Sequence, residues 1–127
     1  MSPKQTIETI FAAFGRGDIP GILAHVAPDC MWRQPKSLPW GGDHRGPEGA
    51  QTFFARLNEA CETTLWEVNE IFENGENVFA FGRHGAKARK TGKSEVSDWA
   101  FHFKVRNGKV VYYTGYPDSA EIVAALN

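Results

Sequence analysis

The segment from Val105 to Val110 constrains the fold of this 127-residue chain more than any other feature. Its centre, Asn107-Gly108, supplies the two positive-φ residues that a two-residue type I′ hairpin turn needs. A hairpin that runs regularly from this turn pairs Val105 with Val110. The turn therefore predicts which side chains share a face along the most apolar stretch of the sequence.

The predicted register gives this hairpin one aromatic face and one mixed face. The aromatic face holds the pairs Val105/Val110, Phe103/Tyr112, Phe101/Thr114 and Trp99/Tyr116, and the mixed face holds Lys104/Val111, His102/Tyr113, Ala100/Gly115 and Asp98/Pro117. Trp99 and Tyr116 carry polar atoms at the open end of the aromatic face, which is typical of a core that opens into a pocket. His102 and Asp98 are expected to face solvent or a second copy of the chain.

The rest of the sequence predicts helices first and strands afterwards. Apolar spacing and caps predict helices over 2–15, from Asp18 to Pro28, and from Pro47 to Leu57, with a short closing helix after Asp118. Strands are predicted at 30–34, 63–72, 78–89, 95–106 and 109–116, and the loop 35–46 has one extended piece near His44. Short connections between the last four strands indicate an antiparallel meander, so we expect one α+β domain over residues 1–127.

Composition and charge argue against several classes of partner. The net charge is −1, and the basic cluster formed by Arg83, Lys87, Arg89, Lys90 and Lys93 lacks interleaved aromatic residues, so we expect a solvated hairpin and no nucleic-acid partner. No apolar run is long enough to cross a bilayer, so no membrane partner is expected.

The cysteines and histidines give no sign of a cofactor or a metal. Cys30 and Cys61 have no partner spacing, and the N-terminus lacks the apolar region of a signal peptide, which predicts reduced thiols in a cytoplasmic protein. The four histidines show no metal-binding spacing, and the glycines form no phosphate-binding loop. We therefore expect neither a metal nor a cofactor.

The order of elements and several short motifs resemble the SnoaL-like group of the nuclear transport factor two-like (NTF2-like) superfamily, which is related to ketosteroid isomerases. The motifs are Phe14-Gly15-Arg16-Gly17-Asp18, Ala27-Pro28-Asp29-Cys30-Met31-Trp32, His44-Arg45-Gly46, Phe53-Phe54 and the Asn-Gly hairpin. The resemblance covers nearly the whole chain. It implies a cone in which a curved, mostly antiparallel sheet wraps three N-terminal helices, with a short C-terminal helix, a pocket inside, and a homodimer through the outer face of the sheet.

The activities known in this group can be checked residue by residue. Ketosteroid isomerases have an Asp-Pro dipeptide whose Asp is the base, whereas this chain has Gln34-Pro35, and an amide cannot take up a proton near neutral pH. Their oxyanion-hole Tyr and Asp correspond to Ile10 and approximately to Phe101. Limonene-type epoxide hydrolases need an acid on the last strand, where this chain has Gly115. Both mechanisms are disfavoured, and no residue matches the Asp of SnoaL-type polyketide cyclases.

The leading hypothesis is a homodimeric protein that binds a small hydrophobic or aromatic molecule, with cofactor-independent acid–base catalysis as its enzymatic form. The predicted pocket residues are Trp32, Gln34, Trp40, Trp99, Tyr112 and Tyr116, with Trp40 as a lid or dimer contact. His44, at the entry to the third helix, is the candidate acid–base group because an imidazole titrates near pH 6.5. The alternative is a non-catalytic binding or assembly module.

Overall fold

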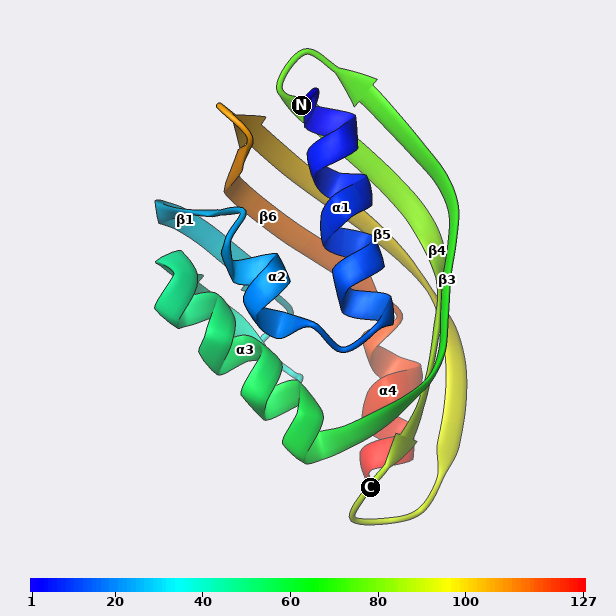
Figure 1. Ribbon diagram of the computed structural model, residues 1–127. Helices are drawn as coiled ribbons and strands as arrows, with labels where there is room; N and C mark the ends of the chain where they lie inside the picture. Colours follow the sequence, from blue (N-terminus) through cyan, green and yellow to red (C-terminus); the bar gives the residue numbers. More distant parts are fainter.

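The structure, a computed structural model, describes residues 1–127 and contains four helices and one six-stranded sheet (Figure 1). In chain order the elements are α1 (Pro3–Gly15), α2 (Ile19–Leu23), β1 (Val26–Gln34), β2 (Gly42–Arg45), α3 (Gly46–Ala60), β3 (Cys61–Asn74), β4 (Asn77–Ala88), β5 (Ser94–Arg106), β6 (Lys109–Pro117) and α4 (Ser119–Leu126). The predicted α+β class is confirmed, and most element boundaries lie within two residues of their predicted positions. No helix is long and apolar enough to span a membrane.

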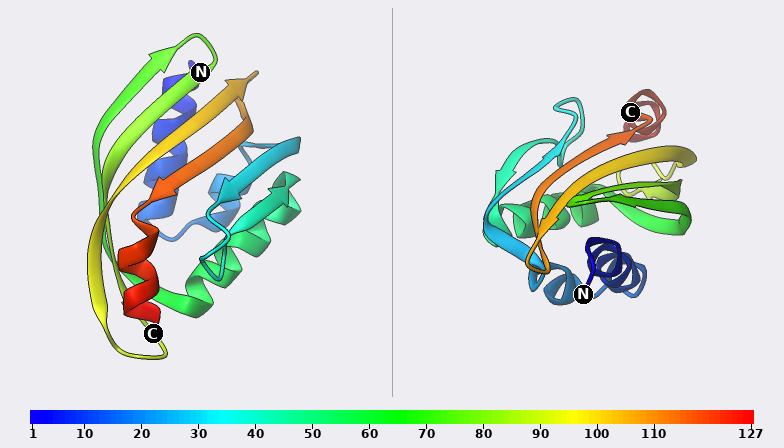
Figure 2. Two further views of the ribbon diagram at one scale, coloured as in Figure 1. Left: turned by 180° about the vertical axis from the view of Figure 1, so that it is seen from behind. Right: turned by 90° about the horizontal axis from the view of Figure 1, so that it is seen from above.

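The sheet is strongly curved, and the three N-terminal helices lie on its concave side (Figures 1 and 2). Its strand order is β2-β1-β6-β5-β4-β3. Every neighbouring pair is antiparallel except β1 and β6, which are parallel. The helix α4 packs on β4 and β5 at the end of the sheet where the β4–β5 hairpin lies.

Three of the four helices begin at a residue whose side chain caps them. The Ser2 side chain accepts a hydrogen bond from the Gln5 backbone N–H, and the Gln5 side chain accepts one from the Ser2 backbone N–H, which is a complete capping box at the start of α1. The carboxylates of Asp18 and Asp118 cap α2 and α4 by accepting a backbone N–H of the first turn. The helix α2 is shorter than predicted, because Val26 belongs to β1 and pairs with Val110 of β6.

The predicted register of the last hairpin is correct at the turn and wrong beyond it. Asn107 and Gly108 both have positive φ, and Val105 pairs with Val110 as expected. The register then shifts, so that Lys104 pairs with Tyr112 and Phe103 pairs with Tyr113. A bulge at Val111 thus turns every later β6 side chain to the opposite face of the sheet.

The core lies between the concave face of the sheet and α1 to α3. It contains Ile7, Ile10 and Phe11 from α1, Phe53 and Phe54 from α3, and Trp99, Phe103 and Val105 from β5. Cys30 and Cys61 are buried free thiols whose pKa burial raises, to about 12 and about 11 respectively. Both side chains are therefore protonated packing groups at neutral pH.

Candidate functional site

A cavity of about 80 Å³ lies between the concave face of the sheet and the helices. A single water needs about 10 to 15 Å³ on this measure, so the space is far larger than a packing defect. Hydrophobic side chains make up 15 of its 20 lining residues. Aromatic rings dominate the wall, and Trp66, Trp99 and Phe101 form a continuous stack with centroid distances of 5.1 and 4.1 Å. Such walls suit a flat, apolar molecule.

Two indole N–H groups in this wall have no hydrogen-bond acceptor. The side chains belong to Trp32 on β1 and Trp99 on β5, which are 3% and 4% exposed. A buried donor without an acceptor costs about 1 to 3 kcal/mol, and native proteins leave few such groups. The two N–H groups are therefore unsatisfied donors on two residues that line the cavity.

A chain of hydrogen bonds connects three further polar groups of the wall. The Trp40 Nε1 donates to Gln34 Oε1 over 2.9 Å, and Gln34 Nε2 donates to the Tyr113 hydroxyl over 2.8 Å. The Tyr113 hydroxyl proton has no acceptor of its own, and burial raises the pKa of this phenol despite the bond from Gln34. Tyr113 therefore stays protonated, and a hydroxyl that already accepts one hydrogen bond donates more strongly.

Three titratable side chains line the cavity, namely His84, Asp98 and Tyr113, although the predicted register had turned Asp98 outward. His84 is the imidazole among them. It lies on the concave side of β4, its Nε2 is 2.9 Å from Thr63 Oγ1, and its other ring nitrogen makes no hydrogen bond. Burial lowers the pKa of His84 to about 4, so the imidazole is neutral at physiological pH. A neutral imidazole can accept a proton or a hydrogen bond from a bound molecule.

Sequence reasoning treated His84 only as a possible metal ligand and missed this position. The alternation of side chains along β4 could have indicated this position, because Val78, Ala80, Gly82 and His84 occupy one face of the strand. The structure contains no cluster of three or more His, Cys, Asp or Glu side chains with metal-binding geometry.

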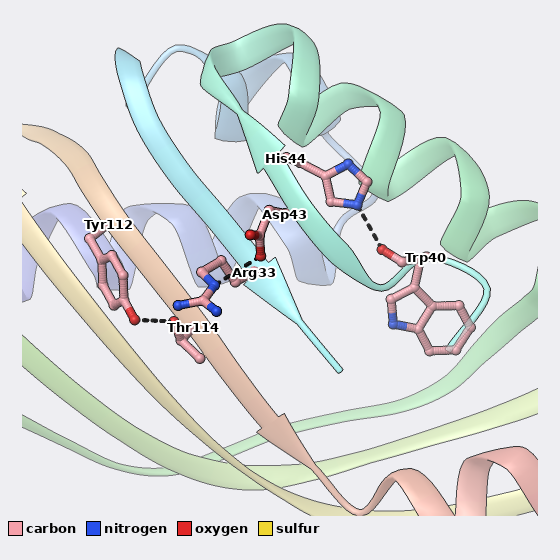
Figure 3. A network of polar contacts seen from close by, with 6 residues as sticks. All are labelled: Arg33, Trp40, Asp43, His44, Tyr112 and Thr114. Carbon is pink, nitrogen blue, oxygen red and sulfur yellow. Dashed lines mark hydrogen bonds and ion pairs between the residues drawn. The ribbon is translucent and has the colours of Figure 1, made fainter. Parts of the chain in front are cut away.

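The structure brings four of the six predicted pocket residues to the cavity. Trp32, Gln34, Trp40 and Trp99 all line it. Tyr112 and Tyr116 do not, because the bulge at Val111 places them on the outer side of β6. Tyr112 accepts a hydrogen bond from Thr114 there, close to the ion pair of Arg33 and Asp43 (Figure 3), and Tyr116 is 60% exposed. Tyr113 takes the inward position that the predicted register gave to Tyr112.

His44 lies outside the cavity wall. Its ring is buried, and its Nε2 is 2.9 Å from the backbone oxygen of Trp40 (Figure 3). The other contact of the ring is with Phe53 on α3, at a centroid distance of 6.0 Å. This contact connects His44 to the loop that carries Trp40, and the acid–base role that the sequence predicted for His44 stays a prediction.

Comparisons with known proteins agree with this geometry. A family model described as a SnoaL-like domain matches residues 7–113. An NTF2-like protein from Burkholderia thailandensis superposes with a TM-score of 0.93 at 26% identity, covering 100% of this chain and 98% of that one. TerC, co-crystallized with polyporic acid, superposes with a TM-score of 0.87 at 25% identity over 98% of both chains.

The sequence is also similar to a protein from a fungal biosynthetic system. Patulin synthesis protein F from Aspergillus clavatus is 31% identical over 78 residues, which are 60% of this chain. The match spans only 39% of the length of that relative. The family model covers most of the chain, and the fold agrees along its whole length, so this chain belongs to the SnoaL-like domain family.

Proposed function

We propose that this protein binds a small aromatic molecule that carries at least one hydrogen-bond-accepting oxygen. The observation that carries the proposal is the pair of buried indole N–H groups, Trp32 Nε1 and Trp99 Nε1, which have no acceptor and belong to residues that line a mostly apolar cavity. The free hydroxyl proton of Tyr113 adds a third donor. A carbonyl or ether oxygen bound there would satisfy donors whose burial is otherwise unfavourable.

Two relatives support this class of ligand. TerC has been crystallized with polyporic acid, and its likeness extends over 98% of both chains. Patulin synthesis protein F is named for the synthesis of a small molecule, although this chain matches a minority of its length. We infer that the cavity of this protein holds a small oxygenated ring compound.

The proposal is tested by titrating the protein with ligands that differ in one acceptor. Benzylacetone has a phenyl ring and a ketone, whereas n-butylbenzene has the ring and no acceptor. We expect the dissociation constant of benzylacetone to be about threefold to tenfold lower than that of n-butylbenzene. One net hydrogen bond contributes about this much to affinity. Polyporic acid is the third ligand of the titration. Calorimetry at fixed pH gives all three constants.

Variants identify the donors. Trp32→Phe and Trp99→Phe each keep an aromatic ring and lose the N–H group, so the preference for benzylacetone over n-butylbenzene should shrink in both. Tyr116→Phe removes an exposed hydroxyl on the outer face and is the matched control. Equal affinity of the wild-type protein for the two ligands, or an unchanged preference in both tryptophan variants, would contradict the proposal.

Acid–base catalysis on the bound molecule is a second candidate function, favoured by the neutral imidazole of His84 in the cavity wall. In this reaction the imidazole takes a proton from the carbon next to a ligand carbonyl, and the electron pair of the broken C–H bond passes to the carbonyl oxygen. The donors of the wall would stabilise the resulting enolate. The proton then returns to carbon, so no cofactor or co-reactant is needed.

We also propose that two copies of the chain associate through the outer face of the sheet. Large apolar side chains gather there in an exposed position, namely Phe72, Phe79, Phe81, Val96 and Tyr116. The pairings Phe72 with Phe79 and Ala100 with Tyr116 place them on adjoining strands of one face. Contiguous exposed apolar surface of this kind marks protein interfaces.

A further inference from the structure

A second, smaller cavity of about 20 Å³ adjoins the main one. Trp40, His84 and Ile122 line both cavities, so the two spaces meet at these side chains. The remaining wall of the small cavity is apolar apart from Glu95 and the Cys61 thiol, which donates to the Leu57 carbonyl. Its volume is that of roughly one water-sized group.

Glu95 lies on the concave face of the sheet, on the strand β5 that also carries the cavity residue Trp99. It pairs with Ala86 of β4, and Ser97 and Trp99 follow on the same face. Four residues of extended chain place Glu95 roughly 13 Å from Trp99 along the strand. A ligand of two or three bonded ring-sized units can therefore reach both residues.

One carboxylate oxygen of Glu95 has no hydrogen-bond partner. The Oε2 atom is fully buried and makes no hydrogen bond, while the Ser97 hydroxyl lies near the carboxyl. Burial raises the pKa of this carboxyl, and the nearby carboxylates of Glu121 and Asp118 add to the rise while the Ser97 hydroxyl opposes it. A buried acceptor without a donor is unfavourable in the same way as the unpaired indole N–H groups.

We propose that the small cavity is a subsite for a hydroxyl group of the ligand, which donates a hydrogen bond to the Glu95 carboxyl. This inference rests on the proposed function, because the rest of the ligand occupies the main cavity. The two cavities then select for opposite polar groups. The main cavity presents donors to an acceptor oxygen, and the small cavity presents an acceptor to a hydroxyl.

A hydroxyl suits this subsite better than an ammonium group. Seven of the nine lining residues are hydrophobic, so an ammonium would lose its water and find a single carboxyl in return. A neutral hydroxyl needs only one acceptor, and Glu95 supplies it in either protonation state. The ligand class is therefore an elongated aromatic compound with a carbonyl at one end and a phenol or alcohol at the other.

The experiment compares benzylacetone with its para-hydroxy and para-methoxy derivatives. The three ketones share the ring and the carbonyl, and only the para-hydroxy compound can donate to Glu95. We expect the wild-type protein to bind it about tenfold more tightly than the other two, as a hydrogen bond to a carboxylate provides. Calorimetric dissociation constants give the ratio directly.

The variant Glu95→Leu should abolish this preference and leave the affinity for benzylacetone unchanged. Glu95→Gln keeps the shape and one acceptor oxygen without the charge, and it should keep a smaller preference even if the leucine variant folds poorly. Glu62→Leu, an exposed carboxylate on β3, is the matched control and should keep the full ratio.

The possible outcomes separate the two proposals. Equal binding of all three ketones by the wild-type protein, or an unchanged ratio in both Glu95 variants, overturns the hydroxyl subsite and leaves the proposed function intact. Failure of the wild-type protein to bind any of the three overturns the proposed function for this ligand class and the subsite with it.

Discussion

What surrounds a histidine on the concave face of the sheet decides what its ring can do in this protein. His84 alternates with Val78, Ala80 and Gly82 toward the cavity, and burial without a carboxylate partner keeps its ring neutral. His44 pairs with Trp32 on the same face, but its ring lies between the backbone oxygen of Trp40 and the ring of Phe53. Of the two imidazoles, His84 is the one that lines the cavity.

The acid–base proposal predicts that the wild-type protein accelerates hydrogen–deuterium exchange next to the carbonyl of benzylacetone. The variant His84→Gln should lose this rate by about a hundredfold, a usual contribution of a general base. The neutral imidazole is the active form, and its pKa is lowered to about 4. The rate should therefore stay constant as the pH falls from 8 to about 5 and drop by half near pH 4. Proton NMR in D₂O measures it.

The matched control for this exchange experiment is His44→Gln. It removes the other candidate imidazole and should keep the wild-type rate and pH profile, apart from any change in the amount of folded protein. A loss of exchange in His44→Gln together with normal exchange in His84→Gln would reverse the assignment. Exchange no faster than in buffer would remove the catalytic candidate and leave the binding proposal.

Strands and helices could be predicted from local patterns, because caps, apolar spacing and the Asn-Gly turn act over a few residues. The bulge at Val111 could not, since no glycine or proline marks it and its cause is long-range. The parallel neighbour β1 pairs Trp32 with Tyr113 and so holds Tyr113 on the inner face. Trp32, Gln34, Trp40 and Trp99 line the cavity as the sequence led us to expect, because their positions do not depend on this register, and their role in binding stays a prediction.

Gly82 shows how β4 and β5 together set the shape of the cavity. It pairs directly with Trp99, and a Cβ at this position would lie 2.5 Å from Trp99 Cζ2 and would clash with the Glu67 backbone oxygen. The absence of a side chain thus lets the indole lie flat on the neighbouring strand. The wall of the cavity depends on this close approach.

The variant Gly82→Ala should therefore lower stability and ligand affinity together. Overpacking of this kind costs about 1 to 3 kcal/mol, and displacement of Trp99 should weaken benzylacetone binding. Denaturant unfolding and calorimetry measure the two effects.

The control Gly15→Ala adds a Cβ whose nearest neighbour is the edge of Trp66 at 3.3 Å, and it should change stability less. An alanine variant at Gly82 with wild-type stability and affinity would refute this account of the wall.

At the scale of the whole molecule, the two faces of the sheet have different surroundings. The concave face is covered by helices and holds the cavity, whereas the convex face carries exposed phenylalanines that no other part of the chain covers. The family resemblance predicted both the cone and a dimer from the sequence. The cone is confirmed by the structure and its relatives, and the dimer stays a prediction because it depends on a second copy.

The dimer proposal predicts a solution mass of twice 14.1 kDa for the wild-type protein. Phe81 lies at 42% exposure on β4, beside Phe72 at a ring distance of 6.3 Å. The variant Phe81→Asp should yield a folded monomer, because a charge buried in an apolar interface lacks a partner, while the exposed position in the single chain tolerates it. Size-exclusion chromatography with light scattering at micromolar concentration measures the mass.

The matched control is Gln51→Asp, on the exposed side of α3, which should leave the mass doubled. A wild-type mass of 14.1 kDa, or a doubled mass in Phe81→Asp, would exclude the convex face as the interface.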